Sequence, residues 1–385
     1  MFEIVEAQQG GTIIKVVGVG GAGGNCVDHM IRSGVQGVEF ICANTDAQAL
    51  IHGLAKNQIQ LGATGLGAGA KPEAGRAAAL EQRDQIAEVL AGAHMVFITA
   101  GMGGGTGTGA APVVAEVAKE MGILTVAVVT KPFSFEGMKR MQSAENGISE
   151  LSQYVDSAIV ILNEKLEQEL GDDISMEDAF SAADNVLKNA VGGISEIINV
   201  KGMINVDFQD VRTVMAEQGM AMMGSGTAGG VDRARIAAEQ AVASPLLEGV
   251  NLSGARGVVV NITANKSSLK MRETKEVLNT IRSFAAEDAT IIFGTVYDEN
   301  MGDELRVTVV ATGLGQMSAS RIPKPQLVVS QKTGTDNIAM GGPDYAALDA
   351  MPAVIRKNRA STIEALQQSG MPTLDIPAFL RKQAD

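Results

Sequence analysis

The stretch GMGGGTGTGAAP (101–112) constrains this chain most, because it holds six glycines and leaves few side chains for a core. The apolar run HMVFITA (94–100) precedes it, and a run with helical spacing follows. Glycine lets backbone N–H groups approach a ligand closely, and a helix N-terminus attracts negative charge. The sequence therefore predicts a phosphate-binding loop between a strand and a helix. Thr106 and Thr108 would add hydroxyl donors, and Pro112 suits the first turn of the helix.

A second glycine-rich loop, GVGGAGG (18–24), follows the apolar run TIIKVVGV (12–19) and precedes a helix expected from about Asn25. Its first, third and sixth residues satisfy the GxGxxG pattern, which also suits a dinucleotide-binding oxidoreductase with Asp46 as the ribose-binding acid. Neither loop is followed by GK[ST], so no P-loop lysine is expected. Two phosphate loops on neighbouring strands favour a nucleoside triphosphate over NAD.

Strands and helices alternate through the first half of the chain. Four apolar runs predict buried strands at 12–19, 37–44, 94–100 and 123–130. A helix is expected at 111–122, with Gly122 as its C-terminal cap. Such alternation predicts an α/β fold, a Rossmann-like parallel sheet with helices on both faces.

One long helix divides the chain. Ser175 and Asp178 form a capping-box pattern, and apolar residues then recur at helical spacing to about Val200. A second, smaller α/β region should follow, with a helix near 232–243 and strands at 257–263, 289–296 and 304–312. The predicted organisation is a flexible N-terminus (1–11), a nucleotide-binding domain (12–174), a central helix (175–200), a C-terminal α/β domain (201–315), a disordered linker (316–373) and a short terminal peptide (374–385).

Composition excludes several classes of protein. The net charge of −13 argues against a general nucleic-acid binder, which would need a basic face. Two cysteines and three scattered histidines give neither a disulfide framework nor a zinc motif, and no metal site made of side chains is expected. The N-terminus lacks the apolar core of a signal peptide, and no apolar run approaches a membrane span. These features predict a cytoplasmic protein.

Several motifs together resemble those of one family. GGGTGTG is the signature of the tubulin and FtsZ GTPases. GVGGAGGN, NTDAQAL, GLGAGA, KPFSFEG, NVDFQDV and the ending LDIPAFLRKQAD all look like the FtsZ proteins of bacterial cell division. The resemblance runs from about residue 12 to 315 and resumes in the last dozen residues. It implies a GTPase that polymerises into the filaments of the division ring at mid-cell.

The resemblance also implies a nucleotide site for GTP and GDP, with Mg²⁺ as the accompanying ion. Asn185, on the central helix, would bind the guanine, while Glu136 and Arg140 would contact the ribose and its surroundings. The other expected nucleotide-binding residues lie in the glycine loops and two neighbouring segments: Gly21, Ala22, Gly23, Gly24, Asn25, Asn44, Asp46, Gly69, Gly103, Gly104, Gly105, Thr106, Gly107 and Thr108.

Asp207 and Asp210 are the expected catalytic residues. They lie three apart just after the central helix, where paired acids can polarise a water or hold Mg²⁺. From spacing alone, a pair of solvated surface charges is the competing interpretation. The resemblance implies that this loop enters the nucleotide pocket of the next subunit, so that head-to-tail assembly completes the active site. Such a heterologous contact does not close and therefore builds a filament.

The terminal peptide is expected to bind partners. Apolar residues and two adjacent cations suit docking into a groove of another protein. The resemblance implies the division proteins FtsA, ZipA and MinC as partners, no nucleic acid, and membrane contact only through these proteins. The expected partner-binding residues are Leu374, Asp375, Ile376, Pro377, Phe379, Leu380, Arg381 and Lys382.

Two departures from the family pattern lie near the expected nucleotide site. Lys71 stands where the family usually has asparagine, in a loop that is a few residues short and is expected near the terminal phosphate. We expect Lys71 to strengthen GTP binding and slow turnover relative to asparagine. Cys26, after Asn25, replaces a small apolar residue and is expected to be a buried small hydrophobe, with a reactive thiol as the alternative.

Overall fold

The structure is a computed structural model that describes residues 11–171, 173–200, 204, 206–217, 219–244, 255–286 and 288–314. The chain has two compact units, residues 1–321 and residues 322–385, and the second lies outside the described residues. The expected N-terminal segment (apart from residue 11), linker and terminal peptide therefore also lie outside them.

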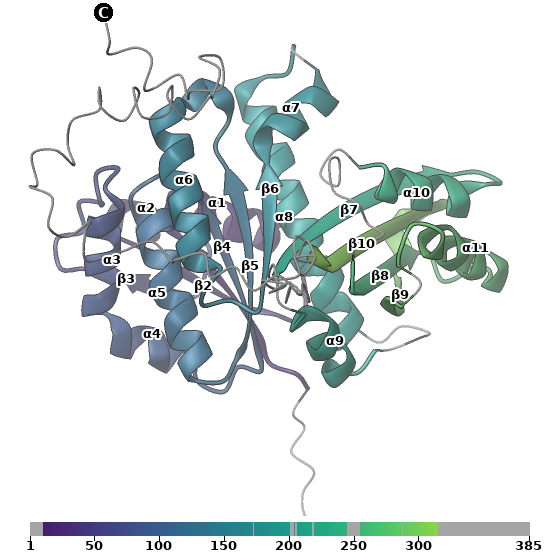
Figure 1. Cartoon of the computed structure of the whole chain (residues 1–385), viewed down its shortest axis with the longest axis horizontal. Helices are drawn as coiled ribbons and strands as arrows, with labels where there is room; N and C mark the ends of the chain where they lie inside the picture. The colour runs from purple at the N-terminus through teal and green to yellow at the C-terminus, as the bar shows by residue number, and fades with distance from the viewer. Residues whose placement is uncertain are drawn as a thin grey trace, which may run out of the picture. The chain divides into compact units, whose positions relative to one another are not determined.

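Within these described ranges, ten strands form one sheet in the order β3-β2-β1-β4-β5-β6-β7-β10-β8-β9 (Figure 1). Their bounds are β1 Ile14–Val19, β2 Glu39–Asn44, β3 Asn57–Gln60, β4 Met95–Gly101, β5 Leu124–Lys131, β6 Ser157–Leu162, β7 Gly219–Gly229, β8 Gly257–Ala264, β9 Thr290–Tyr297 and β10 Glu304–Leu314. The first six strands are parallel, in the 3-2-1-4-5-6 order of Rossmann sheets, so the α/β prediction is confirmed.

Eleven α-helices and two short 3₁₀ helices connect these strands in the described residues. Their bounds are α1 Gly20–Arg32, α2 Ala47–His52, α3 Pro72–Glu81, α4 Arg83–Leu90, α5 Thr106–Glu120, α6 Met138–Leu151, α7 Asn163–Leu170, α8 Met176–Asn199, α9 Phe208–Met215, α10 Arg233–Val242, α11 Met271–Arg282, η1 Ser134–Glu136 and η4 Glu299–Met301.

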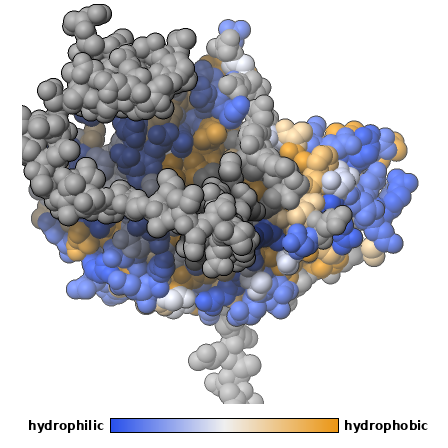
Figure 2. Space-filling view, in the orientation of Figure 1, coloured by the Kyte–Doolittle hydropathy of each residue, from blue (hydrophilic) through white to orange (hydrophobic). Residues whose placement is uncertain are grey.

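Two helical layers enclose the parallel half of the sheet. Buried side chains of α3, α4, α5 and α6 form the core on one face, together with alternate residues of β1, β4 and β5. Those of α1, α2, α8 and α9 form the core on the other face. Figure 1 shows α5 and α6 in front of the strands and α1 and α8 behind them. In the same view the rim of the molecule is mostly hydrophilic, with hydrophobic residues in smaller patches (Figure 2).

The central helix α8 is confirmed nearly as predicted. Its 24 residues begin after Ser175, whose side chain accepts a hydrogen bond from the Asp178 N–H at 3.1 Å. At about 1.5 Å per residue the helix is roughly 36 Å long. Buried residues at helical spacing, among them Leu187, Val191 and Ile194, pack in the core that β5, β6 and β10 share. Its length lets α8 support both halves of the sheet.

The two halves of the sheet are joined more closely than two separate domains would be. Strand β6 pairs with β7 in parallel: Ser157 lies opposite Gly219, Ala158 opposite Met220, and Ile159 opposite Ala221. Strand β10 then runs antiparallel between β7 and β8, while β8 and β9 are parallel. A separate core forms where α10 and α11 cover this second half.

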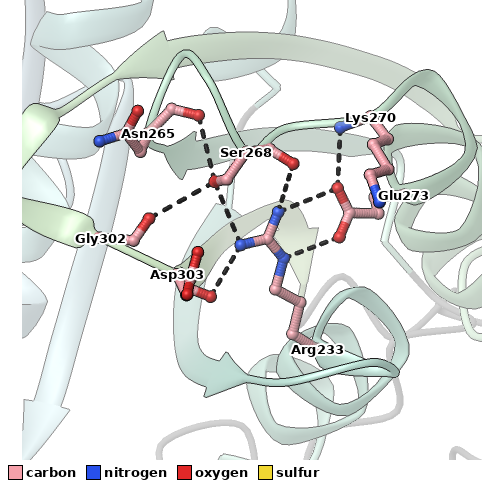
Figure 3. Close-up of polar contacts among 7 residues, drawn as sticks. All are labelled: Arg233, Asn265, Ser268, Lys270, Glu273, Gly302 and Asp303. Atoms are coloured by element: carbon pink, nitrogen blue, oxygen red, sulfur yellow. Dashed lines mark hydrogen bonds and ion pairs between the residues drawn. The ribbon is translucent and has the colours of Figure 1, made fainter.

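A buried ion pair fixes the outer end of the second half (Figure 3). Arg233 of α10 donates to both carboxylate oxygens of Glu273 on α11, at 2.7 and 3.0 Å. Its remaining N–H groups bond the Ser268 hydroxyl and the carbonyl oxygens of Ser268 and Asp303, so all five guanidinium donors have acceptors. Glu273 also accepts the Lys270 N–H at 2.8 Å. These contacts hold two helices and two loops together.

Candidate functional site

A cavity of about 490 Å³ opens at the carboxyl ends of the parallel strands, where the strand order reverses between β1 and β4. Ligands of such sheets bind at this reversal point. The cavity is lined by strand ends, the starts of α1, α5 and α6, and one face of α8. Its residues are Val19, Gly21, Ala22, Asn25, Gly101, Met102, Gly104, Gly105, Thr106, Gly107, Thr130, Pro132, Glu136, Arg140, Asn163, Phe180, Ala183, Asp184 and Leu187.

Both glycine loops reach this cavity, and both helices begin inside them. Helix α1 starts at Gly20 and α5 at Thr106, each about five residues earlier than the sequence predicted. The free N–H groups of their first turns therefore lie among the cavity-lining residues. Pro112, expected in the first turn, instead lies inside α5. The first turn is built from the glycine stretch itself, so the predicted order of strand, glycine loop and helix is present, with the helix start further N-terminal than expected.

The glycines of these loops fall into two groups. A Cβ at Gly20 would lie 2.9 Å from the Gly107 nitrogen, so one loop packs directly on the other. Gly21 and Gly104, in contrast, have no atom within 4 Å of the position that a Cβ would occupy, and both line the cavity. Their bare backbone faces open space that a ligand can fill.

The threonines of the second loop have different partners. Thr106 lies at the cavity, and its hydroxyl is 2.6 Å from that of Thr45 at the end of β2. Thr108 is buried and accepts the Gly103 N–H at 2.8 Å. Thr106 is thus placed to face a ligand, whereas Thr108 holds the shape of the loop.

Glu136 and Arg140 form one wall. The Glu136 carboxylate accepts the Phe133 N–H at 2.9 Å and pairs with the Arg140 guanidinium at 2.9 Å. Phe133 packs edge-on against Phe180, with ring centroids 5.2 Å apart, and Phe180 lines the cavity from α8. This wall offers a charged pair next to an aromatic ring that can contact a flat base.

Helix α8 presents Asp184 to the cavity, and Asn185 is not among the lining residues. Neighbouring helix positions differ by about 100° in direction, so both cannot face the same space. The Asn185 Oδ1 atom accepts from His29 Nε2 at 3.0 Å and from Lys188 Nζ at 3.2 Å. Burial raises the pKa of Asp184 to about 6, and the nearby His29 partly offsets this effect.

Asn163 is a further lining residue that sequence analysis did not identify. It follows β6 directly, is 4% exposed, and its Oδ1 atom has no hydrogen-bond partner in the described residues. An unpaired buried acceptor is costly unless something else satisfies it. Its position at the end of a parallel strand was the available signal, because SAIVIL (157–162) is a buried run like those before the glycine loops.

Several expected nucleotide-binding residues support the loops without lining the main cavity. Gly24 and Asn44 line an adjacent hollow of about 30 Å³ that also touches Gly21. Asp46 caps α2, accepting the N–H groups of Gln48 and Ala49. The remaining residues outside the lining are Gly23, Gly69, Gly103 and Thr108.

Asp207 and Asp210 lie away from this cavity. Helix α8 contributes to the cavity near its start and ends at Asn199, and α9 begins only at Phe208. From Leu187 to Asn199 the helix alone spans about 18 Å. Asp207 caps α9, accepting the Asp210 N–H at 2.8 Å, and the Asp210 side chain is exposed. Figure 1 shows α9 at the lower end and the carboxyl ends of the parallel strands at the upper end.

Both cysteines are buried, at 0% exposed for Cys26 and 4% for Cys42. Burial raises the pKa of both thiols, that of Cys42 to about 12. A thiol with a raised pKa is seldom the reactive thiolate. The burial of Cys26 agrees with the expectation of a buried small hydrophobe and disfavours the alternative of a reactive thiol.

Comparison with known proteins agrees with this geometry. The Tubulin/FtsZ family GTPase domain matches residues 13–171, and the FtsZ family C-terminal domain matches residues 219–315. The cell division protein FtsZ of Pseudomonas aeruginosa is 56% identical, with 100% of each chain covered. The chain belongs to the FtsZ family. FtsZ of Coxiella burnetii is 54% identical over 99% of each chain. A structure titled FtsZ dimer, empty, from M. jannaschii aligns with TM-score 0.77 and 44% identity, covering 81% of this chain and 90% of that one.

As a member of the FtsZ family, the chain is a GTP-binding, GTP-hydrolysing protein of cell division that assembles into filaments. The family assignment shows that the dehydrogenase alternative is wrong. In the described residues, no helix is both long and apolar enough to span a membrane. No cluster of three or more acidic, histidine or cysteine side chains there could hold a metal ion.

Proposed function

We propose that the guanine nucleotide binds in the 490 Å³ cavity, with its phosphates on the two glycine loops and its base against α8. The observation that carries this orientation is that the lining holds two kinds of group. The N-termini of α1 and α5 favour anions, whereas Asp184 on α8 and the unpaired Asn163 oxygen after β6 can accept N–H donors of a base. Glu136 and Arg140 of the same lining would contact the ribose and its surroundings.

Asp184 suits guanine by its chemistry. Guanine offers two adjacent N–H donors, N1–H and the 2-amino group, and an ionised carboxylate accepts both. Adenine offers an acceptor at N1, which would face the carboxylate unfavourably. Asn163 adds an acceptor and a donor beside it. In this proposal Asp184 recognises the base, and Asn185 supports α8 through its bonds to His29 and Lys188.

The phosphate end is built from backbone N–H groups and one hydroxyl. Gly21, Ala22 and Gly104 to Gly107 supply the backbone, and Thr106 donates from its side chain. Because no acidic cluster is present in the described part of the chain, Mg²⁺ would be held mainly by phosphate oxygens and water. It would neutralise charge on the phosphates as the terminal one leaves.

Nucleotide competition tests this proposal. A fluorescent GDP analogue bound to the full chain should be displaced by GTP and GDP, while ATP and NADH should need at least tenfold higher concentration because they lack the paired donors. The bound nucleotide released on denaturing the purified protein should be guanine nucleotide. Equal displacement by ATP would contradict base recognition by Asp184.

We also propose that catalysis requires two subunits. Asp207 and Asp210 are far from the cavity of their own chain, and the chain forms filaments. A head-to-tail contact would bring the α9 end of one subunit against the open cavity of the next. Asp210 would then orient the attacking water, since its exposed carboxylate has no side-chain partner in the described residues, and Asp207 would hold the loop as the cap of α9.

The terminal residues 374–385 are proposed to bind FtsA, ZipA and MinC, and through them to place the filaments at the mid-cell ring. Deleting 374–385 should leave GTP hydrolysis and sedimentable filaments within about twofold of the full chain, because the peptide lies beyond both matched domains. Capture of the truncated chain by immobilised FtsA or ZipA should fall to background. Loss of filaments on truncation would contradict a purely partner-binding role.

A further inference from the structure

Thr45 is a buried polar residue that the proposed nucleotide contacts do not use. It follows β2 directly, is 4% exposed, and is not among the residues that line the cavity. Its hydroxyl oxygen lies 2.6 Å from the hydroxyl oxygen of Thr106, the first residue of α5. Within the described residues the Thr45 hydroxyl has no other hydrogen-bond partner. Thr45 therefore reaches the cavity only through Thr106.

The exposure of the two residues decides which hydroxyl donates. Each hydroxyl has one proton, so only one of the two can donate across the pair. If Thr106 donated, the proton of the buried Thr45 would find no acceptor in this part of the structure, and an unsatisfied buried donor is costly. If Thr45 donates, its own proton is satisfied, and the proton of Thr106, a half-buried residue at the cavity, stays free for a ligand. The structure therefore favours Thr45 as the donor.

The Thr106 side chain is confined between the two loops that flank it. A Cβ at Gly20 would lie 3.3 Å from the Thr106 Cβ, so the first glycine loop closes one side. Thr45 closes another side and is itself held in place, because its carbonyl oxygen accepts the Gly67 N–H at 3.0 Å. An oxygen that accepts a hydrogen bond carries its own proton in a different direction. The Thr106 proton is therefore turned away from Thr45, on a side chain that lines the cavity.

We propose that Thr45 is a positioning residue for the nucleotide phosphates: it donates its hydroxyl proton to Thr106 and so directs the Thr106 proton to a phosphate oxygen. This inference rests on the proposed orientation of the nucleotide, with its phosphates on the two glycine loops. A phosphate oxygen at neutral pH accepts hydrogen bonds, so it needs Thr106 as a donor. A hydroxyl that accepts one hydrogen bond is also a stronger donor of its own proton, because bonded groups polarise one another.

The first test removes the Thr45 hydroxyl. The affinities of guanosine and of guanosine 5′-[β,γ-methylene]triphosphate for the full chain are measured by displacement of a fluorescent GDP analogue, below the concentration at which light scattering shows assembly. Thr45→Val should weaken triphosphate binding about fivefold, because the Thr106 bond to a charged group loses its orientation but not its donor. Guanosine has no phosphate, so its affinity should stay within about twofold. Thr45→Ser restores a hydroxyl and should restore triphosphate binding.

A double-mutant cycle then tests whether Thr45 acts through Thr106. Thr106→Val alone should weaken triphosphate binding about tenfold, as expected for a lost hydrogen bond to a charged group. Adding Thr45→Val to Thr106→Val should change the affinity by less than about twofold, because the hydroxyl that Thr45 orients is already gone. Thr263→Val is the matched control. It also removes the hydroxyl of a buried threonine, on β8 in the second half of the sheet, and it should change neither affinity.

Each other result overturns the inference. Unchanged triphosphate affinity in Thr45→Val would mean that its hydroxyl orients nothing that a phosphate uses. Equal weakening of guanosine, or no recovery in Thr45→Ser, would mean that Thr45 supports the shape of the loop instead. Additive losses in the double variant would mean that Thr45 does not act through Thr106, and the same loss in Thr263→Val would assign the effect to general destabilisation. If the wild-type chain bound guanosine as tightly as the triphosphate, the proposed placement of the phosphates would itself fail, which is a different result from all of these.

Discussion

Asp210→Ala should bind GTP with nearly wild-type affinity and form filaments, yet hydrolyse GTP at least a hundredfold more slowly. The expected decrease in rate follows from the usual contribution of a positioned general base or water-orienting group. Binding should persist because Asp210 is far from the cavity of its own subunit. Phosphate release, nucleotide displacement and sedimentation measure the three properties.

Asp84→Ala is the matched control. Asp84 is also an exposed acid in the first turn of a helix, α4, which lies in the other helical layer. The Asp84→Ala variant should hydrolyse GTP at the wild-type rate. Asp207→Ala is a less direct test, because losing the cap of α9 also costs about 1 kcal/mol of stability.

Mixing two inactive variants distinguishes catalysis between subunits from catalysis within one. Thr106→Val damages the cavity but keeps the acidic loop, and it should be nearly inactive alone. In a 1:1 random copolymer with Asp210→Ala, about a quarter of the head-to-tail contacts would join an intact cavity to an intact loop. Phosphate release should therefore recover a sizeable fraction of the wild-type rate. If both variants co-sediment and the mixture stays inactive, the acids do not act across the contact.

Sequence alone predicted four of the six parallel strands, β1, β2, β4 and β5, and the two glycine loops that follow β1 and β4, but it missed β3 and β6. Glycine loops after apolar runs are local patterns, and the structure brings both to one cavity. Strand β7 was not predicted because GMAMMGSGTAG has low strand propensity. Its Gly226 is needed where α10 packs closely on the backbone of β7, with the Ala237 oxygen against it. Such a tertiary contact leaves no local signal.

The part of the cavity that α8 and the end of β6 line was harder to predict. Asp184 and Asn185 are adjacent on a helix whose apolar periodicity fixes its buried face only approximately, so the pattern could not decide which of them faces the cavity. The bond of Asn185 to His29, which lies 156 positions away in the sequence, turns the Asn185 side chain away from the cavity, and the local bond from Lys188 accompanies it. The Asn163 oxygen likewise becomes notable only once its missing partner is known.

Asp184→Asn should change which nucleotide binds. The amide keeps one acceptor but replaces the other by a donor, so it no longer matches both N–H groups of guanine. GTP affinity should fall about a hundredfold, because the site is left with an unpaired donor facing the 2-amino group. Xanthine carries an oxygen at that carbon, which accepts from the amide, so XTP should become the preferred nucleotide. Displacement assays with GTP and XTP measure this switch, and Asn185→Ala serves as the neighbouring control that should keep the GTP preference.

The same substitution should stabilise the nucleotide-free protein near neutral pH. Burial raises the folded-state pKa of Asp184 from its usual 3.8 to about 6, so the folded protein binds the proton more tightly than the unfolded chain. Stability from this group is therefore present below about pH 4 and is lost as pH rises to about 6 and beyond. After discounting for its partial exposure, the free energy of unfolding at pH 7.5 should rise by on the order of 1 kcal/mol in Asp184→Asn. Urea unfolding at pH 5 and pH 7.5 should show the gain mainly at the higher pH. A gain of equal size at both pH values would mean that burial of the ionised Asp184 carboxylate does not destabilise the folded protein. The proposed cost of keeping this acid in the cavity would then be wrong.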